Sequence, residues 1–216
     1  MSKLNTTNLD QALNQIYNYL SEKKRKFTET FELQITLKNY DIQKDKRFSE
    51  FVKLPHIIKP KMKICVIGDE THCEEAKNLS IPFVDIGTIS SFSGNDKLAK
   101  QWSKRYDGFL ASDKLLKKVT RTVGSLLNKL GKFPKIITHE DSLEDKILEM
   151  KQTIHFQLKK ALNLNTAIGT TELSKQELKE NIVSALDFLV SLLKKRWQNI
   201  DKVYLKSTMS PSFQLF

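Results

Sequence analysis

The sequence predicts a mixed α/β protein of two domains, with both ends of the chain in one domain and the middle in the other. Apolar and polar residues alternate from Phe31 to Leu37 and again from Ile154 to Leu158, as in strands with one solvated face. Between them, short apolar runs alternate with helix-like stretches, which is typical of βαβ units on a parallel sheet. We therefore expect a discontinuous α+β domain from residues 1–60 and 152–216, and an inserted α/β domain from residues 61–151.

The terminal segments carry clear signals for helices and strands. A helix is expected where apolar residues recur at helical spacing, and the longest one should begin at Ser174, because Glu177 three residues later completes a capping box. A polar loop should precede the second strand. In chain order we expect a helix over 9–20, a strand over 31–37, a loop over 39–47, a strand over 51–54, a strand over 154–158, the helix from 174 and a strand over 202–208.

The middle of the chain is expected to begin with a strand buried on both faces, because Ile64 to Ile67 is a continuous apolar run that ends at Gly68. The two chain connections between the domains form a natural hinge. After the first strand we expect a helix over 73–79, a strand over 83–86, a helix over 97–106, a strand over 108–111, a helix over 114–130 and an acidic helix over 142–150.

The composition favours a polyanionic partner. Lysine and arginine number 36 against 25 aspartates and glutamates, a formal net charge of +11, which suits nucleic acid or an anionic membrane surface. No apolar stretch approaches the roughly 20 residues of a membrane span, and residues 1–10 lack the features of a signal peptide. We expect a soluble, unexported protein with Cys65 and Cys73 reduced, because two cysteines provide neither a disulfide framework nor a zinc site.

The sequence contains no recognisable catalytic or cofactor motif. It has neither GxGxxG nor GxxxxGK[ST], and Gly68, Asp69 and Glu70 after the buried strand are expected to form a turn. The four histidines are scattered, and the pair His72 and Cys73 is interpreted as part of a helix surface rather than a metal site. We expect no catalytic residue, no metal, no cofactor and no small-molecule substrate.

Basic residues occur in clusters, each of which could be a nucleic-acid contact or only a solvated face. Phe27 directly follows the first cluster, where it could pack on a sugar or base, or enter the core beside the next strand. At the other end of the chain, Lys206 to Met209 could contact RNA or could be a polar strand end. The clusters are Lys23, Lys24, Arg25 and Lys26; Lys44, Lys46 and Arg47; Lys59, Lys61 and Lys63; Lys114, Lys117, Lys118 and Arg121; and Lys194, Lys195 and Arg196.

Several short segments, spread in order over essentially the whole chain, together carry a family resemblance. They are Lys26 to Thr30, Lys38 to Asp41, Asp45 to Ser49, Gly68-Asp69, His72-Cys73, Glu75 to Lys77, Phe109 to Ser112, Asn128-Lys129, Gly131 to Pro134, Phe188 to Lys195, Trp197 to Asn199 and Lys206 to Met209. These segments resemble the large-subunit stalk protein family, called ribosomal protein L-one in bacteria and L-ten-a in eukaryotes. The resemblance is closest to the eukaryotic branch.

The resemblance implies a fold, a location and a role. The fold of the family has a discontinuous first domain, formed by both ends of the chain, and an inserted Rossmann-like three-layer domain. It implies a structural protein of the cytosolic large ribosomal subunit that binds stalk rRNA and assists release of deacylated tRNA at the exit site, beside other ribosome components and without a membrane. Carried over residue by residue, the RNA-binding residues would be Lys26, Phe27, Glu29, Thr30, Lys206, Ser207, Thr208 and Met209.

The chain departs from the family pattern at three places. Ser210 stands where the family usually has glycine, and Glu50 and Phe51 stand where it has glycine and threonine. In the insert, Ser125 and Leu126 replace part of a Gly-Pro-Gly-rich run, so we expect a more helical segment there. Two further hypotheses stay open: a translational regulator that binds an mRNA mimic of the rRNA site, and a nucleotide-dependent enzyme housed in the insert.

Overall fold

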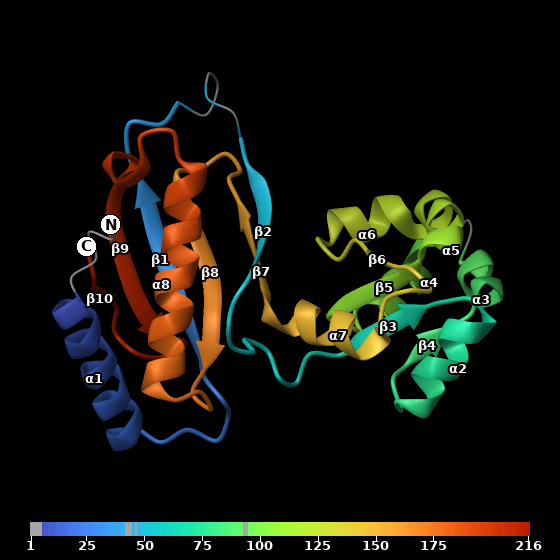
Figure 1. The fold of residues 1–216 in the computed structure, drawn as a ribbon, viewed down its shortest axis with the longest axis horizontal. Helices are drawn as coiled ribbons and strands as arrows, with labels where there is room; N and C mark the ends of the chain where they lie inside the picture. Colours follow the sequence, from blue (N-terminus) through green and yellow to red (C-terminus); the bar gives the residue numbers. More distant parts are fainter. Residues whose placement is uncertain (1–5, 42–44, 46, 93–94) are drawn as a thin grey trace. The chain divides into compact units, whose positions relative to one another are not determined.

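A computed structural model describes residues 6–41, 45, 47–92 and 95–216. The chain divides into two compact units, one formed by residues up to 59 together with residues 152–216, and the other by residues 60–151. Both units combine helices and sheets (Figure 1), which confirms the expected mixed α/β class. Each unit is described by itself.

The first unit contains a four-stranded sheet in the order β10-β9-β1-β8. Strand β1 (Thr30–Leu37) pairs antiparallel with both β8 (Asn163–Thr170) and β9 (Ile200–Ser207), while β10 (Phe213–Gln214) borders β9. Buried and half-buried residues alternate along β1, so one face of the sheet forms the core and the other meets solvent.

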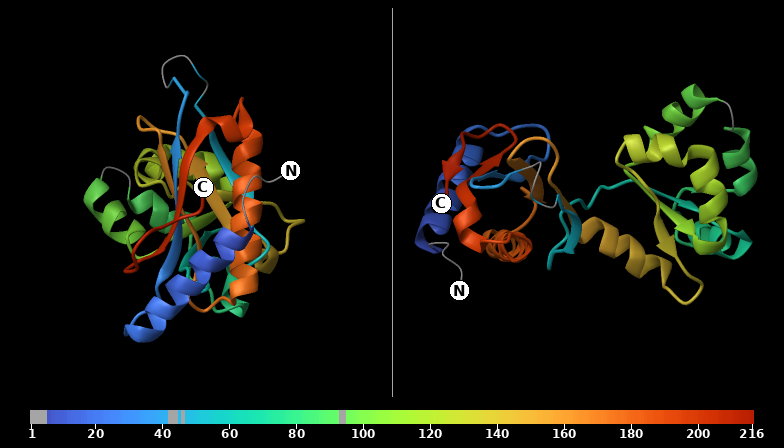
Figure 2. Two further views of the ribbon diagram at one scale, coloured as in Figure 1. Left: turned by 90° about the vertical axis from the view of Figure 1, so that its left-hand side faces the viewer. Right: turned by 90° about the horizontal axis from the view of Figure 1, so that it is seen from above.

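Two helices of the first unit contribute to that core, α1 (Thr6–Glu22) and α8 (Lys175–Leu192), as Figure 2 helps to trace. Leu9, Leu13 and Ile16 of α1 are fully or almost fully buried there. Helix α8 begins with the expected capping box, in which the Ser174 hydroxyl accepts from the Glu177 amide and the Glu177 carboxylate accepts from the Ser174 amide. The first long helix and the capped helix were therefore predicted correctly.

A separate two-stranded ribbon extends the same unit. It pairs β2 (Ser49–Lys53) antiparallel with β7 (Thr153–Gln157), so the segments that enter and leave the insert run side by side. Ile154 and Phe156 are buried and join the core of the first unit, while alternate residues of the ribbon are exposed. The ribbon therefore has an inner, apolar face and an outer, solvated face.

Two buried asparagines hold irregular segments of the first unit in place. Asn181 on α8 is fully buried, and its side chain accepts from the His56 amide and donates to the Ile168 carbonyl. Asn199 lies in a short 3-10 turn (Arg196–Asn199), accepts from the Lys195 amide and donates to the carbonyls of Lys38 and Asn39. Each asparagine side chain therefore provides hydrogen-bond partners for backbone amides and carbonyls that have no such partner within a strand or helix.

The second unit is built on a parallel sheet in the order β4-β3-β5-β6. Cys65 and Ile67 pack with α3 to α6 on one side, while Ile64 and Val66 pack with α2 and α7 on the other, which gives three layers. The elements are β3 (Ile64–Ile67), α2 (Glu70–Asn78), β4 (Phe83–Val84), α3 (Ile86–Ser91), α4 (Asp96–Ser103), β5 (Gly108–Ser112), α5 (Asp113–Val119), a π-helical turn (Thr120–Gly124), α6 (Ser125–Lys129), β6 (Lys135–Ile137) and α7 (Leu143–Gln152).

Some elements were missed by the sequence analysis. Strand β8 lies where no strand was expected, because its polar Asn163 and Asn165 obscure the apolar pattern of Leu164 and Ile168. The short helix α3 and the edge strands β6 and β10 were also missed. The expected loop over 39–47 lies partly outside the described residues, and Lys44 and Lys46 are among those left out. Residues 1–5, part of the segment in which no signal peptide was expected, also lie outside the described residues.

We predict that Asn181→Ala lowers the free energy of unfolding by about 1–3 kcal/mol, because it leaves the half-buried His56 amide and the buried Ile168 carbonyl without the side-chain partner. Equilibrium urea denaturation measures this loss. Asn18→Ala, on the exposed side of α1, is the matched control and should change stability by less than about 0.5 kcal/mol. Equal stability of the two variants would show that the buried side chain contributes nothing.

Candidate nucleic-acid interface

The segments expected to contact RNA meet at one end of the four-stranded sheet. Strand β1 begins where β8 and β9 end, with Thr30 opposite Thr170 and Phe31 opposite Ser207. The chain just before β1 and the chain just after β9 therefore lie together, although they come from opposite ends of the sequence. We call this region, Lys26–Thr30 with Lys206–Ser210, the strand-end surface.

A buried carboxylate forms the centre of the strand-end surface. Glu29 is 2% exposed, and its Oε2 accepts hydrogen bonds from the Ser207 hydroxyl at 2.7 Å and from the Met209 amide at 3.0 Å. Its Oε1 lies 3.3 Å from Arg25 Nε, without the alignment of a hydrogen bond. Charge-assisted bonds of this kind are stronger than neutral ones, so Glu29 fixes the turn after β9 against the start of β1.

Two hydroxyl groups complete this arrangement. The Thr208 Oγ1 accepts from the Thr30 amide at 3.1 Å and lies 3.4 Å from the Thr30 carbonyl, to which it can donate. The Ser207 amide donates to Ser210 Oγ at 2.8 Å, and that hydroxyl donates in turn to the Pro211 carbonyl. Beyond the last residue of β9, the backbone of residues 208–211 is therefore held by side chains rather than by a sheet ladder.

The rigid turn presents exposed side chains above the buried ones. Phe27 is 53% exposed and Met209 is 48% exposed, and Lys26 and Thr208 also face solvent. A groove of about 360 Å³ adjoins them and brings together aromatic and basic side chains. Its lining residues are Tyr17, Leu20, Ser21, Lys23, Lys24, Arg25, Phe27, Glu29 and Thr171.

The structure separates the eight expected RNA-binding residues into two groups. Glu29 and Ser207 are buried and bonded to each other, so the expected direct contact through these two side chains is not available in this conformation. The other six are exposed or half-buried: Lys26, Phe27, Thr30, Lys206, Thr208 and Met209. Phe27 lies outside the core, which excludes the alternative of a core residue at the strand entry.

The sequence analysis missed one partner of this surface. Glu172, from the turn after β8, accepts from the Thr28 hydroxyl at 3.1 Å. No local pattern links residues that lie 144 positions apart.

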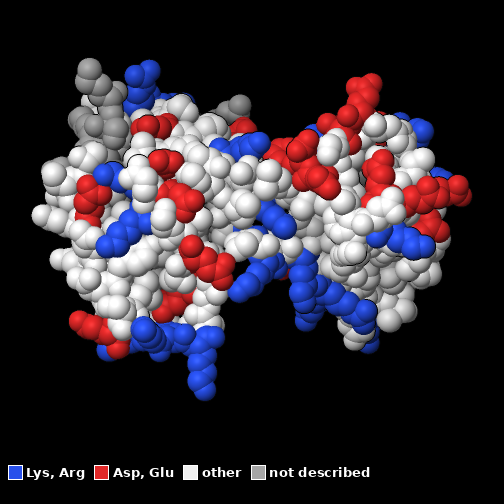
Figure 3. Space-filling view, turned by 60° about the horizontal axis from the view of Figure 1, so that its bottom comes forward, with Lys and Arg blue, Asp and Glu red and all other residues white. Residues whose placement is uncertain are grey.

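On the face drawn in Figure 3, acidic groups lie among the basic ones on the first unit, and basic side chains gather along its lower edge. Positive charge on the first unit is therefore distributed in patches.

The second unit has a cavity of about 470 Å³ where β3 and β5 end, the usual ligand position of a parallel sheet. Its walls carry Asp69, Glu70 and Asp85, and the Ser112 hydroxyl donates to Asp69. No glycine-rich phosphate loop is present at this edge of the sheet, and the lining sets three carboxylates against one lysine, Lys114, which disfavours phosphate. The described residues also contain no group of three or more histidines, cysteines or carboxylates that could hold a metal.

The histidine and cysteine pair of the insert differs from expectation. His72 is 2% exposed and stacks on His139 with ring centroids 4.6 Å apart, so the interpretation of His72 as a helix-surface residue was wrong. Burial raises the pKa of the Cys73 thiol, and it raises the pKa of Cys65 to about 12. Both thiols are therefore protonated at neutral pH, which disfavours nucleophilic chemistry.

None of the helices in the described part of the chain is both long and apolar enough for a membrane span.

Comparison with known proteins identifies the family. The model of the ribosomal protein L1p/L10e family matches residues 19–211. The chain belongs to this family. It is 49% identical over 216 residues to large ribosomal subunit protein uL1 of Oryza sativa subsp. japonica and 48% identical over 215 residues to that of Spodoptera frugiperda. The matches cover all of this chain and 100% and 99%, respectively, of those two relatives.

The departures of this family member from the expected pattern are accommodated locally. Ser210 is buried and uses its hydroxyl in two hydrogen bonds, and it does not have the positive φ that would require glycine. Ser125 and Leu126 lie in α6, directly after a π-helical turn, so this segment is helical. Glu50 and Phe51 lie within β2.

We predict that Glu29→Ala lowers the free energy of unfolding by about 1–3 kcal/mol, because it leaves the buried Ser207 hydroxyl and the Met209 amide without their acceptor. Urea denaturation followed by tryptophan fluorescence measures this loss. Glu22→Ala, at the exposed end of α1, is the control and should change stability by less than about 0.5 kcal/mol. If both variants unfold alike, the carboxylate does not hold the two segments together.

Proposed function

We propose that this protein is a structural, non-catalytic constituent of the large ribosomal subunit, and that its strand-end surface binds stalk rRNA near the tRNA exit site. Family membership supports the ribosomal role, since the matched relatives are named large ribosomal subunit protein uL1. The basic composition, with a net charge of +11, supports a nucleic-acid partner. The cytosolic ribosome would be its location, with other ribosome components as neighbours.

The observation that carries the rRNA site is the fixed geometry of the strand-end surface. Phe27, Thr208 and Met209 are exposed, yet the backbone around them is held by the buried Glu29. Structured RNA presents 2′-hydroxyls, sugars and unstacked bases, which hydroxyl, thioether and aromatic groups can contact. Because the turn is already ordered, binding does not have to order it, which favours affinity.

The neighbouring basic groove supplies the complementary charge. Lys23, Lys24 and Arg25 line the groove beside Phe27, so phosphates of the bound RNA would lie against α1's end. Glu29 and Ser207 act in this proposal as positioning residues, which hold the contacts without touching RNA. The protein would thereby assist the release of deacylated tRNA at the exit site.

We predict that Phe27→Ala and Met209→Ala each weaken binding to the stalk segment of the protein's own large-subunit rRNA by about 1–3 kcal/mol, as loss of a good base or sugar contact does. Filter binding against the stalk RNA and a scrambled hairpin of equal length measures this. Phe83→Ala, which removes a similarly exposed ring (42% exposed) from the insert, should leave the affinity unchanged.

The salt dependence of wild-type binding provides an independent readout. Each displaced phosphate counterion contributes a slope of about 0.7 to 0.9 in log affinity against log salt, so the stalk RNA should give a steep slope. Preference for the stalk over the scrambled hairpin should persist as salt rises. Equal affinity for both RNAs, or unchanged stalk affinity in both strand-end variants, would refute the assigned surface.

A further inference from the structure

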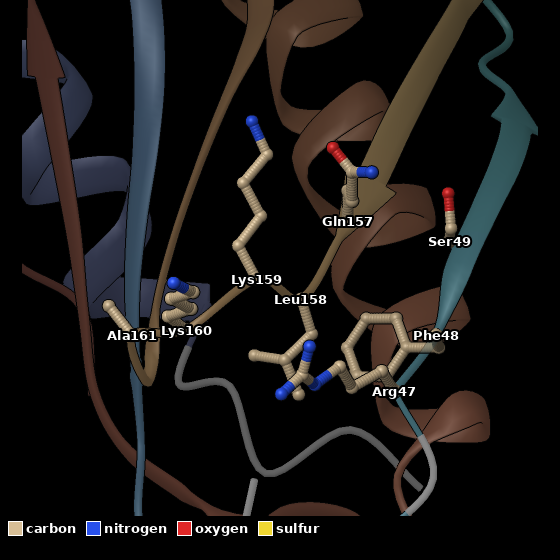
Figure 4. Close-up of a pocket in the computed structure, with 8 residues that line it drawn as sticks. All are labelled: Arg47, Phe48, Ser49, Gln157, Leu158, Lys159, Lys160 and Ala161. Atoms are coloured by element: carbon tan, nitrogen blue, oxygen red, sulfur yellow. The ribbon is translucent and has the colours of Figure 1, made fainter.

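A basic pocket lies at one end of the ribbon formed by β2 and β7 (Figure 4). Its volume is about 680 Å³, and it is formed by the start of β2, the end of β7 and the connection from β7 to β8. Arg47, Lys159 and Lys160 supply three cationic side chains, while Phe48 and Leu158 supply apolar wall. No acidic side chain among the described residues lines the pocket. The pocket therefore combines charge of one sign with an apolar wall.

Backbone hydrogen bonds hold the connection from β7 to β8 at both of its ends. The Leu158 amide donates to the Phe48 carbonyl at 3.0 Å, and the Leu37 amide donates to the Leu162 carbonyl at 2.9 Å. Residues 159–161 lie between these two anchors. The backbone that carries the two lysines is therefore held in place before any ligand binds, which lowers the entropic cost of binding.

Two acidic residues flank the pocket in the sequence, but neither opposes its charge. Asp45 lies two residues before Arg47, and its carboxylate pairs with Lys194 at 2.7 Å. The hydrogen bond from Lys194 lowers the pKa of Asp45, so this carboxylate stays ionised and its charge is balanced by the lysine. Glu50 points to the other face of the ribbon from Ser49, because successive side chains of a strand alternate.

The chemistry of the lining suits a ligand with several phosphates. Clefts with charge of one sign and low-dielectric walls concentrate the electric field and attract counter-ions. The Arg47 guanidinium offers two parallel N–H donors to one phosphate, whereas a lysine ammonium acts as a point charge. Figure 4 shows Lys159 and Lys160 extending from the chain in different directions, which favours separate phosphates over a single shared one. Gln157, at the end of β7, adds an uncharged amide donor.

We propose that this pocket is a second RNA-binding site, which binds neighbouring phosphates of an RNA backbone without reading the base sequence. An RNA strand carries one phosphate per nucleotide, so cations on adjoining segments can each meet a phosphate of the same strand. The site goes beyond the proposed rRNA contact, because it shares no residue with the strand-end surface.

Strand β1 separates the two sites. It begins at the strand-end surface and ends at Leu37, whose amide bonds to the connection that carries the two lysines. Its eight residues span about 25 Å. The pocket and the strand-end surface would therefore contact different nucleotides, and their contributions to binding can be measured separately.

Fluorescence anisotropy with the full chain and a labelled dodecamer of uridine, at several salt concentrations, tests the pocket. This RNA has no stable fold, so it reports backbone contacts rather than recognition of a structured stalk. Replacing Arg47, Lys159 and Lys160 together by glutamine should reduce the slope of log affinity against log salt by about 0.7 for each side chain that binds a phosphate. Between about 1 M and 0.1 M salt, that slope corresponds to roughly 5-fold in affinity for each lost contact.

Two controls separate the pocket from the general basic charge of the chain. Replacing Lys97, Lys100 and Lys104 by glutamine removes the same net charge from exposed positions on α4 and at its end, and should leave the slope unchanged. Arg47→Lys keeps the charge of the pocket and should keep the wild-type slope. Urea denaturation should give wild-type midpoints for both triple variants, because all six replaced side chains are exposed.

Nuclear magnetic resonance of the isotopically labelled chain locates the contact. Addition of the dodecamer should shift the amide resonances of residues 47–49 and 157–161. Equal slopes for the two triple variants, or no shifts in these two segments, would overturn the second RNA site. Shifts there with inorganic phosphate but not with the dodecamer would also overturn it, and would leave a site for small anions. Loss of binding to phosphatidylserine vesicles with unchanged RNA binding would assign the pocket to lipid headgroups instead.

These outcomes are distinct from those that test the strand-end surface. Phe27→Ala and Met209→Ala are measured on the stalk rRNA, whereas the pocket variants are measured by the salt slope of an unstructured RNA. Failure of the two strand-end variants to weaken stalk binding would refute the first site alone. Failure of the pocket variant to reduce the slope would refute the second site alone.

Discussion

The buried carboxylate of Glu29 joins chain segments that are 178 residues apart, and the geometry of the strand-end surface depends on that contact. Strand β1 is central in its sheet only because both β8 and the late strand β9 pair with it. The first unit therefore cannot complete its sheet until the C-terminal segment is present. An interior carboxylate is tolerated because the Ser207 hydroxyl, the Met209 amide and Arg25 offset its desolvation.

Local patterns in the sequence predicted the elements whose signal is local. The alternation from Phe31 to Leu37 and the capping box at Ser174 correspond to β1 and α8, since periodicity and caps depend on adjacent residues. Strand β8 escaped because its place at the edge of the sheet is set by pairing with β1, not by its own composition. Short edge strands such as β6 are likewise defined by a neighbour that sequence spacing does not reveal.

The candidate site was predictable in position but not in the role of each residue. Lys26, Phe27 and the segment ending at Met209 were singled out from charge, an adjacent aromatic ring and family resemblance. Glu29 and Ser207 share those segments, and nothing in the local sequence distinguishes a buried acid from an exposed one. Only the pairing of β1 with β9 brings their side chains together, so burial follows from a long-range contact.

The strand-end surface occupies one end of the first unit's sheet, and this limits the RNA that it can contact. Phe27 precedes the first residue of β1, and Thr208 and Met209 follow the last residue of β9. Strand β1 has eight residues, so its ends lie about 25 Å apart. A single nucleotide cannot span that separation. An RNA segment held at the strand-end surface would therefore contact one end of the sheet, and the antiparallel pairing of β1 with β9 would fix where its contacts lie.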